Sequence, residues 1–154
     1  MKRILLFLLI FLVSCGSQIN PNVPLKEIAG EMNRVISNGD KLSDVDADYI
    51  RGMLGIEEEL IDEFVLYIQT SGTEIDQYGI FKISDSRNFD AVKTRLQNYL
   101  TNLLENFDNF NYMPEERVKL KEAEVTSAGQ YLIYTVMSES DKTAFMNKFN
   151  EMTK

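Results

Sequence analysis

One arrangement of residues occurs twice along this chain, and it leaves few possible folds. In each half, two segments rich in β-branched and aromatic residues are followed by a Ser–acid–Ser sequence and then by apolar residues at helical spacing. The Ser–acid–Ser sequences lie at 84–86 and 138–140, where their side chains can cap the helix that follows. The repeated layout predicts an α+β domain built from two β-β-α units.

The segments around these units complete the predicted fold. Two helices precede the first unit: one begins at Pro24, and a shorter one covers residues 46–54, with Gly55 just past its end. We expect a four-stranded antiparallel sheet with the helices packed on one face. The predicted strands cover residues 64–68, 78–83, 123–126 and 131–137.

Alternation along the predicted strands assigns their side chains to two faces of the sheet. If the face that carries Phe81 and Tyr134 packs beneath the helices, the opposite face carries more apolar and aromatic area than a free surface usually does, and such patches often mark interfaces. We therefore predict a candidate interface for a protein partner or for a second copy of the chain. Two alternatives remain: the N-terminal helices fold over this face, or the two faces are exchanged. The candidate interface residues are Val65, Tyr67, Tyr78, Ile80, Tyr131 and Ile133.

The start of the chain has the organisation of a secretory signal peptide. Lys2 and Arg3 supply positive charge, and residues 4–13 form an apolar run that is shorter than the about 20 residues needed to cross a bilayer. Cys15, the only cysteine of the chain, follows within two residues of this run. The alternative is an ordinary secreted protein with a chance cysteine near its cleavage site.

The sequence Leu12-Val13-Ser14-Cys15 resembles the lipobox of bacterial lipoproteins. The resemblance implies that the chain is cut before Cys15 and that the cysteine sulfur carries a diacylglyceryl group with acyl chains such as palmitate. Two or more acyl chains anchor stably, because each buried methylene contributes about 0.8 kcal/mol. We expect an exported protein that is lipid-anchored to the cell membrane and faces outward. The expected division is a signal peptide (1–14), a tether (15–24) and a single α+β domain (25–154).

Composition argues against several classes of function. Once Lys2 and Arg3 are removed, 14 basic and 24 acidic residues give a net charge of −10, which opposes binding to nucleic acid. The chain has no histidine, and lipid would occupy its one cysteine, so the commonest general base and the usual zinc ligands are missing. We expect no enzymatic activity, no metal and no cofactor. An enzyme built on carboxylates, Ser/Lys or Tyr is the weakest alternative.

Two acidic segments invite a binding interpretation. Residues 44–48 (DVDAD) begin like a calcium loop, but Tyr49 occupies the glycine position of such a loop and Gly55 its glutamate position. Capping of the second helix by Asp44 or Asp46 is therefore the favoured interpretation, with weak calcium binding as the alternative. The cluster at 57–59 (EEE) is interpreted as a solvated acidic edge rather than as a catalytic carboxylate pair.

Short segments spread along the chain resemble a known family. They are Gly-Ile at 55–56, Phe-Val-Leu-Tyr-Ile at 64–68, Gly-Ile-Phe-Lys-Ile at 79–83 and Gly-Gln-Tyr-Leu-Ile-Tyr at 129–134. With the lipobox and the two leading helices, they resemble the small bacterial lipoproteins of domain-of-unknown-function family 4358, over about residues 23–152. The resemblance implies a lipid-anchored α+β domain of the cell envelope, mainly in Gram-positive bacteria, and it brings no activity.

The type of envelope has a second interpretation. Gly16 follows the cysteine, where lipoproteins retained in a Gram-negative inner membrane carry an aspartate, so a cell with two membranes would send this protein to its outer membrane. In either cell, we predict a non-catalytic protein-interaction or regulatory domain. Its expected partners are the membrane, through Cys15, and an envelope protein or a second copy, through the candidate interface. The alternative is an envelope module that binds a small ligand or a cation between sheet and helices.

Overall fold

The domain is built around one five-stranded antiparallel sheet. The computed structural model describes residues 23–110 and 113–154. The strands lie in the order β1-β2-β3-β5-β4, so β1 and β4 are the two edges. Their bounds are β1 (Leu42–Asp44), β2 (Ile61–Gln69), β3 (Gln77–Ile83), β4 (Glu124–Ala128) and β5 (Tyr131–Val136). The predicted α+β class and the four predicted strands are confirmed. The fifth strand, β1, was not predicted, because three residues are too few to show alternation.

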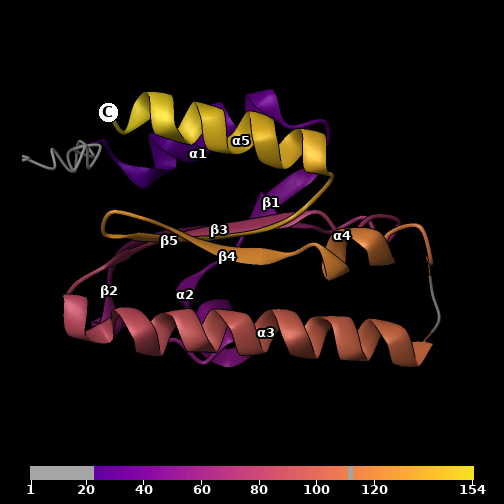
Figure 1. Ribbon diagram of the computed structural model, residues 1–154, viewed down its shortest axis with the longest axis horizontal. Coiled ribbons are helices and arrows are strands. Elements are labelled where there is room, and N and C mark those ends of the chain that lie inside the picture. Colours follow the sequence, from indigo (N-terminus) through magenta and orange to yellow (C-terminus); the bar gives the residue numbers. More distant parts are fainter. Residues whose placement is uncertain (1–22, 111–112) are drawn as a thin grey trace, which may run out of the picture.

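Helices cover both faces of the sheet, which gives the domain three layers (Figure 1). The long helix α3 (Phe89–Phe110) packs on one face, and α1 (Leu25–Val35) and α5 (Glu139–Met152) pack together on the other. The prediction that the helices lie on one face is therefore wrong. The physical reason is that the central strands carry large apolar side chains on both sides, and each fully buried side chain of this size stabilises the fold by about 1.5–3 kcal/mol.

The second predicted helix is divided into two kinds of turn. A short α-helix, α2 (Ala47–Tyr49), continues directly into a π-helical turn, η2 (Ile50–Leu54), on the α3 side of the sheet. Gly55 ends this segment in the left-handed conformation with φ 65°, as predicted. The shorter elements are η1 (Gly39–Lys41), η3 (Glu58–Leu60), η4 (Ser86–Asn88) and α4 (Arg117–Lys121).

Both Ser–acid–Ser sequences cap the element that follows, although different residues of the sequence do so. Ser138 precedes α5, and its hydroxyl accepts a hydrogen bond from the backbone N–H of Asp141 at 3.2 Å. In the first half the cap is Asp85, whose carboxylate accepts from the N–H of Arg87 at 2.8 Å. Asp85 therefore begins the η4 turn, and α3 starts directly after that turn.

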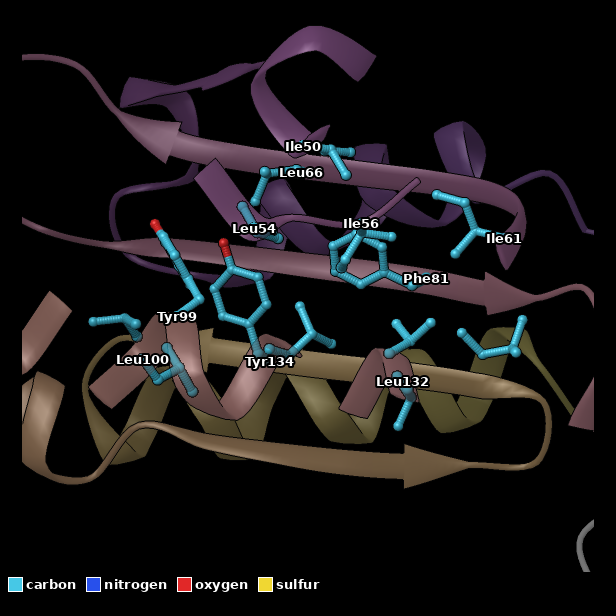
Figure 2. Packing of buried hydrophobic residues seen from close by; sticks show 14 of the residues in the cluster. Ile50, Leu54, Ile56, Ile61, Leu66, Phe81, Tyr99, Leu100, Leu132 and Tyr134 are labelled. Carbon is cyan, nitrogen blue, oxygen red and sulfur yellow. The ribbon is translucent and has the colours of Figure 1, made fainter. Parts of the chain in front are cut away.

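The core on the α3 side combines apolar side chains with a buried polar group, the side-chain amide of Gln77. Figure 2 shows apolar residues of η2, β2, β3, α3 and β5 pointing toward one another. Within this layer the hydroxyls of Tyr99 and Tyr134 both donate to Oε1 of Gln77, at 2.7 and 3.1 Å. The rings of Phe81 and Tyr134 pack against Gly79, which has no side chain. A Cβ at this position would lie 2.6 Å from atoms of both rings.

Candidate functional site

The sheet face predicted as an interface is an internal surface in the structure. Helices α1 and α5 cover it, and four of its six residues are buried: Tyr78, Ile80, Tyr131 and Ile133. The hydroxyl of Tyr78 donates to Oδ1 of Asn33 at 2.8 Å, and the Tyr131 ring meets that of Phe149 edge-on, with centroids 5.7 Å apart. The alternative in which the N-terminal helices fold over this face is therefore correct for α1 and wrong for α2 and η2, which lie on the α3 side; α5 joins α1 on this face.

The other two residues of this face, Val65 and Tyr67, remain partly accessible. They border a hollow of about 220 Å³ beside β2, where the edge strand β1 ends, and we call it the Tyr67 hollow. It exists because β1 is short: β1 pairs with residues 67–69, and the N–H of Val45 donates to the carbonyl of Leu66 at 3.0 Å, where the pairing ends. The residues lining the hollow are Lys26, Asp44, Val45, Glu63, Phe64, Val65, Leu66 and Tyr67.

The Tyr67 hollow offers an aromatic side chain with charges of both signs around it. Burial and the nearby carboxylate of Asp44 raise the pKa of Tyr67, so its hydroxyl stays protonated and can donate a hydrogen bond. The carboxylate of Glu63 accepts the first N–H of α1, from Leu25, at 2.7 Å. Such a site can contact a polar or cationic group. Lys26 also lines it, and its positive charge weakens the attraction of the two carboxylates for a cation.

A larger groove lies at the opposite edge of the sheet, between α3, α4 and β4. Its volume is about 420 Å³, and we call it the α3–β4 groove. Sequence reasoning did not find it, because it depends on β4 being an edge strand and on α3 lying over that edge, and neither property is local. The residues lining it are Gln97, Leu100, Thr101, Leu104, Leu120, Lys121, Ala123, Glu124 and Val125.

The calcium-like segment serves as a helix cap. The carboxylate of Asp46 accepts from the N–H of Tyr49 at 3.1 Å and so caps α2, as the favoured interpretation predicted. Asp48 pairs with Arg51 one turn later. Across residues 23–110 and 113–154, no three His, Cys, Asp or Glu side chains are grouped so that they could hold a metal ion. The three glutamates at 57–59 are exposed, as the interpretation of a solvated edge requires.

A cluster of charges surrounds the buried carboxylate of Asp76, and every member of it has a partner. The carboxylate of Asp76, only 4% exposed, accepts from Nζ of Lys119 at 2.8 Å and from the amide of Asn38 at 3.2 Å. The same ammonium group lies 2.8 Å from Glu116, which also accepts the N–H of Ile75 at 3.2 Å. The cluster joins α4 to the start of β3 and to the end of α1, so it has a structural role.

The predicted lipidation site and signal peptide lie outside the residues that the structure describes. Cys15 and residues 1–14 are therefore known from the sequence alone. Among the helices of the described residues, none combines the length and the apolar character required to cross a membrane.

Comparison with known proteins gives one match. The profile of the family described as "Domain of unknown function (DUF4358)" matches residues 34–137, about two thirds of the chain. The chain belongs to this family. No curated protein and no solved structure matches it. The matched segment of this DUF4358 protein contains all five strands with α2, α3 and α4, whereas almost all of α1 and all of α5 lie outside it.

Proposed function

We propose that this DUF4358 protein is an exported lipoprotein whose domain binds another envelope protein, or regulates one, without catalysing a reaction. The observation that carries the proposal is the position of Cys15, the only cysteine, at the end of a lipobox-like sequence directly after the charged and apolar start of the chain. An acyl anchor at Cys15 would keep the domain on the outer face of the membrane.

The geometry of the domain supports a binding role close to the membrane. Leu25 lies ten positions after Cys15, so the start of α1 lies within about 35 Å of the anchor even if the tether is fully extended. Both faces of the sheet are covered by helices, so a partner at the membrane would not contact the sheet face itself. The Tyr67 hollow and the α3–β4 groove lie at the two edges of the sheet and offer such a partner two hollowed surfaces.

The anchor is tested by metabolic labelling with an alkynyl palmitate in the cells that make the protein. The unsubstituted chain should take up the label and lose fourteen residues. Cys15→Ala should take up none, because it has no acceptor sulfur, and should keep those residues. Ser17→Ala is the matched control and should behave like the unsubstituted chain. A labelled Cys15→Ala chain would contradict the proposal.

The second candidate function is binding of a small cationic ligand, and the Tyr67 hollow is the feature that favours it. An aromatic ring beside the carboxylates of Asp44 and Glu63 is the chemistry that holds an ammonium group. The test is a titration with tetramethylammonium and with neutral neopentyl alcohol, followed by the NMR signals of Tyr67. Saturable shifts with the cation alone would support this function, and equal responses to both compounds would remove it.

A further inference from the structure

The outer edge of β4 is an unpaired edge of the sheet. Strand β4 ends the sheet on its side, and no strand of the described residues pairs with its outer edge. Sheet edges are commonly protected by charged side chains, above all lysine, by proline or by a β-bulge. The sequence of β4 is Glu-Val-Thr-Ser-Ala, so its one charge is Glu124 at its first residue, and it contains no lysine or proline. It pairs with β5 over five consecutive residues without a register shift.

The hairpin geometry determines which backbone groups of β4 face outward. The N–H of Ile83 on β3 donates to the carbonyl of Gln130 at 3.0 Å, so the even-numbered residues of β5 bond toward β3 and the odd-numbered ones toward β4. The odd-numbered residues of β5 pair with Glu124, Thr126 and Ala128. Alternation therefore directs the N–H and C=O groups of Val125 and Ser127 away from the sheet.

This edge is complementary to itself. If a second copy pairs antiparallel with β4 about Thr126, Val125 lies opposite Ser127 of the second copy, and these are the two residues whose backbone groups face outward. Each Val125–Ser127 pair can then exchange both N–H···O bonds. Glu124, the only charged residue of the strand, lies opposite Ala128, so no like charges meet. At the two-fold axis Thr126 lies opposite itself, a favourable cross-strand pair.

The α3–β4 groove lies beside the same edge. Its walls include the apolar side chains of Leu104 on α3, Leu120 on α4 and Val125 on β4. Because a two-fold axis at Thr126 brings two copies of β4 together, it also brings the two grooves together on the α3 side of a continuous sheet. Apolar surface that each groove exposes alone would then be shared between the two copies.

We infer that β4 is a self-association edge, through which two copies of this chain form one ten-stranded sheet about an axis at Thr126. A second copy is the occupant that the register of β4 fits, since each of its five residues finds an opposite residue and the two Glu124 carboxylates stay apart. The inference goes beyond the proposed function, because pairing at β4 needs neither the lipid anchor nor an envelope partner. The palmitate experiment and the one below can therefore fail independently.

The test is disulfide formation by Thr126→Cys in the full chain, made in its own cells and oxidised there. The two Thr126 residues would form a pair without backbone hydrogen bonds, with Cα atoms about 4.5 Å apart, which is within disulfide reach. Thr126→Cys should therefore give a covalent dimer. The parent chain, with Cys15 alone, measures any cross-link through that residue.

Glu124→Cys is the matched control on the same strand. In the inferred pairing the two copies of residue 124 are offset by four residues, about 13 Å, so they should not cross-link. A second measurement is sedimentation of the detergent-extracted chain, in which Thr126→Lys should shift a dimer to monomer by placing two ammonium groups at the axis. Three outcomes would overturn the inference: a Thr126→Cys chain that stays monomeric, equal cross-linking at 124 and 126, or a cross-link from 126 to a different protein.

Discussion

Ser37 and Asp141 are 104 residues apart in the sequence and are joined by two hydrogen bonds. The backbone N–H and the hydroxyl of Ser37 both donate to Oδ1 of Asp141, at 3.0 and 2.9 Å. Ser37 follows α1, and Asp141 lies in the first turn of α5. The pair therefore joins the end of α1 to the start of α5, the two helices that cover the same face of the sheet. Both helices lie almost entirely outside the segment matched by the family profile.

The Asp141 carboxylate should make the stability of the fold depend on pH. Burial acts to raise its pKa, but the hydrogen bonds from Ser138 and Ser37 outweigh burial and lower it. A carboxyl group with a lowered pKa in the folded state contributes stability above its unfolded pKa of about 3.9, and this contribution is lost as the pH falls through the folded pKa.

Asp141→Asn should therefore cost about 1–2 kcal/mol of unfolding free energy at neutral pH, and clearly less at a pH below the folded pKa. Urea unfolding of both chains at several pH values measures the difference. Asp90→Asn, which changes an exposed carboxylate in the first turn of α3, is the control. An equal loss for Asp141→Asn at every pH would show that shape, rather than charge, carries the contact.

Gly79 and Gly30 should respond to alanine in opposite ways. At Gly79 the new Cβ would lie 2.6 Å from the rings of both Phe81 and Tyr134, so Gly79→Ala should destabilise the fold by about 1–3 kcal/mol. Gly30 is exposed in the middle of α1, and a Cβ there meets nothing within 4 Å, so Gly30→Ala should stabilise by up to about 1 kcal/mol. Thermal unfolding of the two variants gives both signs in one experiment. Destabilisation by Gly30→Ala would contradict the assigned environment of α1.

Three tyrosines should resist ionisation in alkaline solution. Burial raises the pKa of Tyr78, Tyr99 and Tyr134 above the ordinary value near 10, and for each of them burial is the largest cause. Because the unfolded chain loses these protons first, the fold should lose stability as the pH rises above about 10. Phenolate absorbance should show the more accessible tyrosines titrating first, and Tyr78, Tyr99 and Tyr134 ionising together with unfolding. A single smooth titration of all tyrosines below the unfolding pH would contradict this.

The sequence predicted the local structure and which strand residues lie on the same face of the sheet. It did not predict the features that depend on contacts between distant segments. Alternation correctly placed Phe81 with Tyr134 on one face and Tyr78 with Ile80 on the other. It could not say that α5 covers the second of these faces, because the apolar stripe that includes Phe145 would fit either side of the sheet. The sequence also could not show which strands form the two edges of the sheet. Strand β1 is too short to recognise, and the strand order is not a local property.

The buried cluster around Asp76 provides the last prediction. Burial alone would lower the pKa of Lys119, but its hydrogen bonds and charge interactions with Asp76 and Glu116 raise it, so the lysine stays charged. Lys119→Met would remove that charge and leave the Asp76 carboxylate, 4% exposed, with only the amide of Asn38. We expect a loss of about 3 kcal/mol, which is typical of a buried pair that loses one partner.

Adding Asp76→Asn to Lys119→Met should restore part of that loss, because the uncompensated buried charge is then gone. The control is Lys148→Met, which removes a lysine whose carboxylate partner, Glu151, is 70% exposed; an exposed pair of this kind contributes about 0–1 kcal/mol. Urea unfolding of the parent chain, the three single variants and the double variant completes the comparison. If the double variant is less stable than Lys119→Met by the full cost of Asp76→Asn alone, the two residues act independently, and the cluster does not hold α4 against β3.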